Sequence, residues 1–257
     1  MSDMMPIIFI GHGSPMNGVE DNEFARAWHN LSLEIPKPEF ILSISAHWVT
    51  KGTRITSNDR LKTIHDFYGF PQELYNIEYP AFGAPEIAGK VIEQVKDFQI
   101  TLDNSWGLDH GTWIVLRRMY PKAQIPVIQL SLDYTKPPNE HFELGKELKS
   151  LRNQGVLILG SGNIVHNLGM MNPNTSLPFD WAHKYDELIK DLIEQKDYSS
   201  IINYQKFGQI AQLSIPTNEH YLPLLYVLAA SDKTDSLSFG CEKIVYSSIS
   251  MRYVLFS

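Results

Sequence analysis

The chain has 257 residues, of which 43% are hydrophobic and 11% aromatic, so it can bury a sizeable core and is not a disordered polypeptide. Its 22 basic and 29 acidic side chains give a net charge of −7, without a basic run that could follow a phosphate backbone, which argues against a nucleic-acid partner. A single cysteine, Cys241, excludes an internal disulfide, and the opening residues MSDMM lack the order of a secretion signal. We therefore expect a cytoplasmic protein.

The longest apolar run, residues 221–230, is too short to cross a membrane. It has about half of the roughly 20 residues that a spanning helix needs, and it contains Pro223. We expect no membrane association.

Runs rich in β-branched residues alternate along the chain with segments in which apolar residues recur every three to four positions. The first pattern is typical of buried strands and the second of amphipathic helices. In chain order, they predict strands at 6–10 and 39–47, a helix at 84–97, strands at 99–103 and 125–132, a helix at 140–153, a strand at 156–160 and a helix at 179–196. The last segment, residues 243–256, alternates apolar and polar positions and predicts an edge or antiparallel strand.

This order of elements predicts an α/β fold with three layers, α/β/α, around a central, largely parallel, mixed sheet. No repeat, low-complexity tract or linker divides the sequence, so we expect one domain over residues 1–257. Residues 63–85 form a long stretch without periodicity, rich in aromatic residues and proline, and a structured loop of that length is typically functional. We expect this loop to form the wall of a pocket.

Five of the nine histidines follow predicted strands or precede predicted helices, where open parallel sheets bind their ligands. These are His12, His47, His110, His166 and His220. Each of them alone is better explained as a structural residue with a hydrogen-bond partner. Together they favour a metal site, because neutral imidazole is the commonest ligand of zinc and a frequent ligand of iron.

The other four histidines have more ordinary surroundings. His29, His141 and His183 lie within helical patterns, where a surface or packing role is the default, and His65 lies in the long loop.

Other catalytic motifs are incomplete. The glycines on either side of His12 do not continue into a dinucleotide-binding or phosphate-binding loop. The serines that follow predicted strands lack the Gly-x-Ser-x-Gly pattern of a hydrolase nucleophile.

With these residues assembled, the sequence resembles the extradiol aromatic ring-opening dioxygenases of the LigB-like class, in particular their 4,5-DOPA dioxygenase-type subgroup. The resemblance covers nearly the whole chain. The motifs that carry it are GHGSPMN (11–17), SAHW (45–48), TIHDFYGFPQELY (63–75), YPAFGAP (79–85), WGLDHGTW (106–113), QLSLD (129–133), GSGNIVHNL (160–168) and PTNEHYLPLLYVLAA (216–230).

The resemblance implies one divalent metal ion per chain, Zn²⁺ or Fe²⁺, bound by His12, His47 and His220. It also implies that His166 is a fourth ligand or an acid/base group, and that His110 faces the substrate. Glu219 is a second candidate for the third ligand position, but neighbours at a helix start point about 100° apart, so only one of the pair reaches the metal. The subgroup pattern favours His220.

The implied reaction inserts both atoms of O₂ into a small aromatic diol such as L-DOPA and opens its ring. Trp48, His65 and Tyr68 are the expected substrate contacts. Other aromatic side chains are candidates either for stacking on the substrate or for filling the core: Phe67, Phe70, Tyr75 and Trp113.

Two alternative functions fit the same residues. One is a zinc-dependent hydrolase, in which the metal lowers the pKa of a water molecule to roughly 7. The other is a non-catalytic small-ligand binding module whose histidines are structural. The sequence leaves open the oligomeric state, the physiological catechol and the bond that is cleaved.

Overall fold

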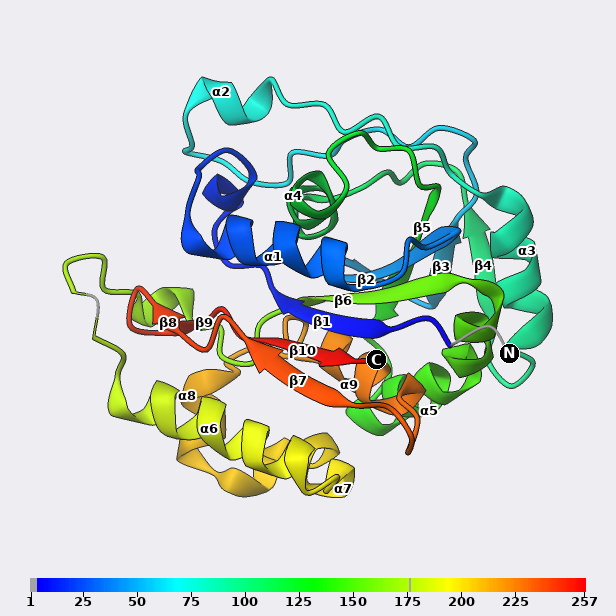
Figure 1. The fold of residues 1–257 in the computed structure, drawn as a ribbon. Helices are drawn as coiled ribbons and strands as arrows, with labels where there is room; N and C mark the ends of the chain where they lie inside the picture. Colours follow the sequence, from blue (N-terminus) through cyan, green and yellow to red (C-terminus); the bar gives the residue numbers. More distant parts are fainter. Residues whose placement is uncertain (1–3, 176) are drawn as a thin grey trace.

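The computed structural model describes residues 4–175 and 177–257, which are built around one large mixed sheet (Figure 1). Its strands are β1 (Ile7–Gly11), β2 (Phe40–Thr50), β3 (Thr53–Thr56), β4 (Ile100–Asp103), β5 (Val127–Asp133), β6 (Val156–Gly162), β7 (Leu237–Gly240) and β10 (Tyr253–Phe256). They follow the order β4-β3-β5-β2-β6-β1-β10-β7, in which the central β5, β2, β6 and β1 run parallel. A small separate sheet pairs β8 (Ile244–Val245) with β9 (Ile249–Ser250).

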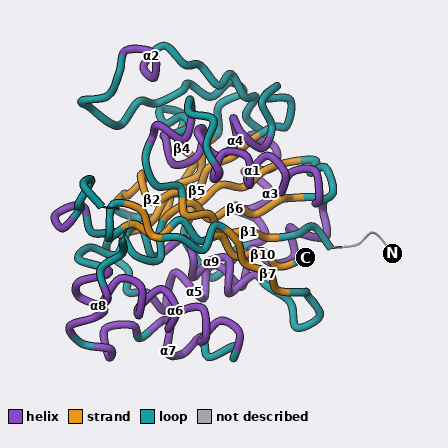
Figure 2. Tube along the Cα trace, turned by 60° about the vertical axis from the view of Figure 1, so that its left-hand side comes forward, coloured by secondary structure: helices purple, strands orange, loops and turns teal. Residues whose placement is uncertain are grey.

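Helices cover both faces of the large sheet, which gives three layers (Figure 2). The helices are α1 (Glu23–Glu34), α2 (Gln72–Tyr75), α3 (Pro85–Gln94), α4 (His110–Met119), α5 (Pro138–Leu148), α6 (Asp180–Glu194), α7 (Tyr198–Ile202), α8 (Gln209–Ser214) and α9 (Leu222–Ala230). One apolar core contains α1 and α4, and the other contains α3, α5, α6 and α9. The predicted α/β/α architecture with a largely parallel, mixed sheet is confirmed.

The central strands show why the sequence predicted this arrangement. Every residue of β5 and of β6 is buried, because helices pack on both sides of the sheet. Strands of that kind read as continuous apolar runs rather than as an alternating pattern.

Some boundaries differ from those predicted. The helix expected at 140–153 ends at Leu148 and continues as a tighter 3₁₀ helix over 149–154, which Gly155 terminates with φ 75°. Strand β2 runs to Thr50, three residues past His47, and β3 and α1 are additional elements.

The C-terminal segment 243–256 is not one strand. Tyr246 and Ser247 both have positive φ, 49° and 64°, so the chain turns sharply between β8 and β9. Strand β10 then pairs antiparallel with both β1 and β7. The antiparallel direction was predicted correctly, but β7, not this segment, forms the edge of the sheet.

The apolar run at 221–230 forms α9, in which every residue is buried against the sheet and α5. Across residues 4–175 and 177–257, none of the helices combines the length and apolar character needed to cross a membrane.

A carboxylate stabilises the turn that follows β4. Asp103 accepts hydrogen bonds from the Ser105 hydroxyl at 2.7 Å, from the backbone N–H groups of Trp106 and Ser105 at 2.9 and 2.8 Å, and from the Arg54 guanidinium at 3.0 Å. Burial by itself would raise the pKa of Asp103, but these donors outweigh it and lower that pKa to about 2.

We expect Asp103→Asn to reduce the free energy of unfolding near pH 7 by about 1–2 kcal/mol, because the charged hydrogen bonds are lost. The contribution of the carboxylate is complete above its unfolded-state pKa of about 3.9 and disappears as pH falls toward its folded-state pKa of about 2. Urea unfolding of both proteins across this pH range measures the difference. A difference that does not shrink on acidification would contradict the assignment.

Candidate functional site

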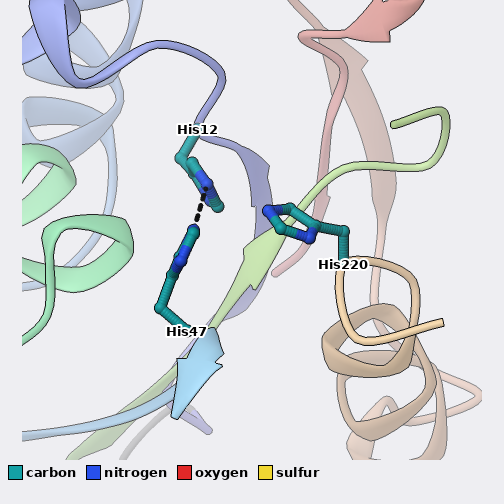
Figure 3. A group of neighbouring side chains, drawn as sticks. All are labelled: His12, His47 and His220. Carbon is teal, nitrogen blue, oxygen red and sulfur yellow. Dashed lines mark hydrogen bonds between the residues drawn. The ribbon is translucent and has the colours of Figure 1, made fainter. Parts of the chain in front are cut away.

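Three histidines from distant parts of the sequence meet at the carboxyl end of the sheet. His12 follows β1, His47 lies near the end of β2, and His220 lies just before α9 (Figure 3). One ring nitrogen from each lies within 4.8 Å of the other two. Strands β1 and β2 flank β6 in the sheet, so their carboxyl ends carry the first two imidazoles to one place.

The backbone around His12 requires glycine. Gly13 has φ 58°, a left-handed conformation, and a Cβ there would lie 2.4 Å from Sδ of Met251. The turn is held by the Asn17 amide, which donates to the His12 carbonyl at 2.9 Å. The His12 ring is thereby directed away from the strand and toward His47.

An irregularity in β2 sets the position of His47. The register of β2 against β5 shifts between Ile44 and Val49, as a β-bulge does, and bulges commonly redirect a side chain beside a functional site. Within this stretch, the His47 N–H donates to Ser45 Oγ at 3.2 Å, and Ser45 Oγ donates to the buried carboxylate of Asp109 at 2.7 Å.

Close approach of the backbone sets the position of His220. A Cβ on Gly162 would lie 2.1 Å from the His220 carbonyl oxygen, so only glycine at the end of β6 lets the segment before α9 come this near. The same carbonyl accepts a hydrogen bond from Asn163 N–H at 2.8 Å. Glu219 Oε1 lies 3.2 Å from His220 Nδ1.

Hydrogen bonding determines which ring nitrogens carry protons. Ser161 Oγ donates its single proton to the Gly111 carbonyl at 2.6 Å, so it accepts from His12 Nδ1 at 3.0 Å. The Asp66 carboxylate lies 3.2 Å from His47 Nδ1, and an anion at that distance favours a proton on this nitrogen. With its proton on Nδ1, each ring keeps a lone pair on Nε2.

These two lone-pair nitrogens face each other. The dashed line in Figure 3 joins Nε2 of His12 to Nε2 of His47, which are 3.0 Å apart. A shared proton is disfavoured because burial first, and then the neighbouring imidazoles, lower the pKa of His12 well below its usual value. Burial and the same kind of neighbours lower the pKa of His220. His12, His47 and His220 thus offer a set of imidazole donors of the kind that binds a metal ion.

Asp66 connects the long loop to this cluster. Its Oδ1 accepts a hydrogen bond from the His110 backbone N–H at 2.8 Å, and its Oδ2 lies 3.0 Å from His110 Nδ1 as well as near His47. Burial alone would raise the pKa of Asp66, but its contacts with His110 and His47 outweigh burial and hold that pKa far below its usual range. The carboxylate is therefore ionised and orients both rings.

His110 and His166 complete the cluster from opposite sides. His110 is the first residue of α4, and its ring centroid lies 3.8 Å from that of His47. The His166 ring stacks on His220 at 3.5 Å, with the planes 8° from parallel. Burial lowers the pKa of both residues, to about 4 for His166, so both rings are neutral near pH 7.

A cavity of about 620 Å³ opens in front of the histidines. All five histidines singled out in the sequence line it, and the loop adds Asp66, Phe67, Tyr68 and Phe70 to its wall. The side chain of Tyr68 is 92% exposed at the rim. As expected, the long loop forms part of a pocket wall.

Two expected substrate contacts lie outside this cavity. Side chains alternate along a strand, so Trp48 points away from His47, where it is buried and stacks on Trp106 at 5.5 Å. His65 Nε2 lies 3.0 Å from the Ile77 carbonyl, which holds the loop together. These positions do not support direct substrate contact by Trp48 or His65.

The sequence did not single out Asp66, Asp109 or Ser161 as site residues. Asp66 lies next to His65 in a loop without periodicity, and it meets His110 across 44 positions of sequence, so no local pattern pointed to it. Asp109 binds Ser45 and Gln129 from the N-cap of α4. Their shared feature is that each orients an imidazole or the backbone that carries one.

The fold and the histidine cluster at the carboxyl edge of the sheet define the chain as an α/β protein with a candidate metal site. Comparison with known proteins identifies its family. Residues 5–255 match the family model described as "Catalytic LigB subunit of aromatic ring-opening dioxygenase". The chain belongs to this LigB family, so it is an aromatic ring-opening dioxygenase, an enzyme of a metal-dependent family that acts on an aromatic substrate and O₂.

Individual relatives agree with that family. The chain is 44% identical over 255 residues to "4,5-DOPA dioxygenase extradiol" of Escherichia coli (strain K12), covering 97% of this chain and 94% of the relative. It is 37% identical over 233 residues to the protein of the same name from Mirabilis jalapa, covering 88% and 86%. A crystal structure of an uncharacterised Escherichia coli K12 protein superposes with a TM-score of 0.86 at 40% identity, covering 98% of this chain and all of the other. The expected family and enzyme class are confirmed.

Proposed function

We propose that this enzyme is an extradiol dioxygenase that opens the ring of a 3,4-dihydroxyphenyl compound of the L-DOPA type, acting as one catalytic domain over the whole chain. The observation that carries the proposal is the convergence of three imidazole nitrogens beside a cavity with aromatic walls. The names of the relatives from Escherichia coli and Mirabilis jalapa support the substrate class.

His12, His47 and His220 are the proposed metal ligands. The fit rests on the chemistry of the donors: the contacts of His12 and His47 leave their Nε2 atoms unprotonated, and an ion would relieve the opposition of the two lone pairs. Glu219 lies 3.2 Å from His220 Nδ1, which supports a role in orienting that ring, as carboxylates commonly do for metal-bound histidines. When bound, the metal would supply the positive charge that holds a catechol and the redox capacity that ring opening needs.

His110 is the proposed general base for a catechol hydroxyl. With the Nδ1 proton held toward Asp66, its Nε2 is free to accept a proton, and the lowered pKa of His110 keeps the ring neutral beforehand. The Asp66 carboxylate then stabilises the imidazolium that forms, as the aspartate of a catalytic triad does. His166 lies on the far side of the cluster from His110. It is proposed to form a hydrogen bond with the oxygen atoms that O₂ supplies to the substrate. Phe67 and Tyr68 are proposed to contact the aromatic ring.

Iron(II) is the proposed active metal, because ring opening with O₂ needs a redox-active ion and Zn²⁺ has no accessible redox change. The test is to remove metal with a chelator, reload the protein anaerobically with Fe²⁺ or Zn²⁺, and add L-DOPA and air. Oxygen uptake in equal amount to the diol, with a yellow ring-opened product, is expected for the iron form alone.

The zinc-hydrolase alternative predicts the reverse result. Ester or amide cleavage by the zinc form, with no oxygen uptake by the iron form, would overturn the dioxygenase proposal. Membership of the LigB family favours the dioxygenase.

Asp66→Asn tests how the loop supports the metal site. The amide cannot replace the negative oxygen beside His47 and His110, so we expect metal affinity to fall about 10–100-fold, the usual effect of removing a carboxylate that orients a metal-bound histidine. Competition with a fluorescent chelator measures the affinity. Asp21→Asn, at a carboxylate that pairs with Arg26 on the surface, is the matched control, and equal affinities in the two variants would contradict the proposed role.

A further inference from the structure

The catalytic cavity has two ends of different character. At its inner end lie the histidines and Asp66, and His12, His110 and His220 among them are almost completely buried. Toward the solvent, the wall is largely made of apolar and aromatic side chains, together with Ser14. The polar groups that the proposed chemistry needs therefore occupy only the inner end.

Four large hydrophobic side chains at the outer end of the cavity remain exposed to solvent. They are Tyr68, Leu168, Met171 and Tyr246, with exposed fractions between 39% and 92%, and we call this set the apolar rim. They come from three separate segments: the long loop, the 3₁₀ turn after β6 and the turn between β8 and β9. Single exposed hydrophobic side chains are ordinary, but a group gathered at one cavity mouth is typical of a ligand-binding surface.

The cavity is larger than a catechol with a short side chain requires. Its volume of about 620 Å³ lies within the range of roughly 300–1,000 Å³ that is typical of cavities enclosing drug-sized ligands. L-DOPA consists of one ring and a three-carbon side chain, so with its diol at the histidines it fills only the inner part of that volume. A substituent that continues beyond this side chain reaches the apolar rim, which borders the same cavity.

From the size of the cavity and the exposure of its apolar rim, we propose that the enzyme prefers compounds of the L-DOPA type whose side chain continues in a further apolar group, and that the rim binds this group. The inference rests on the function proposed above and narrows its substrate class. Contact between the two removes apolar surface of both substrate and rim from water. Binding energy from a part of the substrate remote from the reacting bonds raises kcat/KM without any change at the metal site.

Three compounds with the same catechol ring test the preference: L-DOPA and the two amides that its carboxyl group forms with methylamine and with benzylamine. The amides carry the same charge and differ only by the phenyl ring of the benzylamide. We expect oxygen uptake by the iron-loaded enzyme to give a kcat/KM about tenfold higher for the benzylamide than for the methylamide. This ratio equals about 1.4 kcal/mol, as expected when part of a phenyl ring is buried. L-DOPA itself should also be opened.

Removing apolar surface from the rim should reduce this ratio. The double variant Leu168→Ser with Met171→Ser changes two exposed side chains that line the cavity, so the fold should be retained. We expect it to lower the benzylamide-to-methylamide ratio of kcat/KM by about threefold or more, because less apolar surface is buried. Leu33→Ser with Leu102→Ser, at exposed leucines of α1 and β4 outside the cavity, is the matched control and should leave the ratio unchanged.

Different results would overturn the proposed function and the substrate preference. If none of the three compounds is opened, the proposed function fails. If L-DOPA is opened but the benzylamide is used no better than the methylamide, the function stands and the preference for an apolar extension is wrong. If the rim variant changes the ratio no more than its control does, the apolar rim does not bind the extension. An altered oligomeric state of that variant in size-exclusion chromatography would then show that the rim contacts a second copy of the chain instead.

Discussion

Substituting His12 by alanine is expected to abolish metal binding and turnover together. The change removes one of the three imidazole donors. It also removes the hydrogen bond to Ser161, which places the His12 ring proton on Nδ1 and leaves Nε2 unprotonated. Loss of several kcal/mol of metal-derived stabilisation of the reaction corresponds to a decrease in kcat of about 10³-fold or more. Elemental analysis of the purified variant and oxygen uptake with a catechol measure the two effects.

Loss of metal binding can also be tested by a stability measurement, which does not depend on activity. A metal that binds the folded state raises the midpoint temperature of thermal unfolding of the unsubstituted enzyme. In His12→Ala, adding Fe²⁺ or Zn²⁺ should leave that temperature almost unchanged. His29→Ala, at an exposed histidine of α1, is the matched control and should retain both the shift and the activity. Full metal content in His12→Ala would show that His12 is not a ligand.

Replacing His110 by glutamine is expected to separate catalysis from metal binding. Glutamine keeps much of the size of the ring but cannot take up a proton, so we expect kcat to fall about 10²–10⁴-fold, the usual contribution of a general base. Because His110 is not one of the three proposed ligands, the metal content should remain at one ion per chain.

Single-turnover kinetics, with the iron-loaded variant in excess over the catechol, measure the chemical step directly. His29→Gln provides the comparison for a histidine-to-glutamine change outside the site. If His110→Gln loses its metal, His110 supports the ligand set rather than the proton transfer. If its turnover is unchanged, the base is another group, and His166 is the next residue to substitute.

Asp66 links the cavity wall to the proposed metal site. The same loop segment carries the carboxylate that contacts His47 and His110 and the aromatic side chains Phe67 and Tyr68 that line the cavity. A displacement of this loop would therefore disturb the histidines and the cavity wall together. For this reason we expect Asp66→Asn to change the positions of His47 and His110 as well as that of the loop.

The sequence by itself determined the features that repeat locally. The apolar runs predicted the buried strands because a strand covered on both faces needs apolar side chains at every position, as in β5 and β6. Position relative to the predicted strands and helices was also enough to single out five histidines, because open parallel sheets bind ligands at one edge. The choice of His12, His47 and His220 as metal ligands came from the family resemblance. The shared motifs then identified the LigB family, which the comparisons confirm.

Only the tertiary structure decided how the side chains around those histidines meet. Asp66 contacts His110 across 44 positions and Ser161 contacts His12 across 149, and no periodic pattern records such pairs. Trp48 was expected to contact the substrate as an aromatic side chain, yet strand alternation turns its ring to Trp106. Protonation, orientation and charge at this site depend on contacts between distant segments, and such contacts are determined by packing rather than by local sequence.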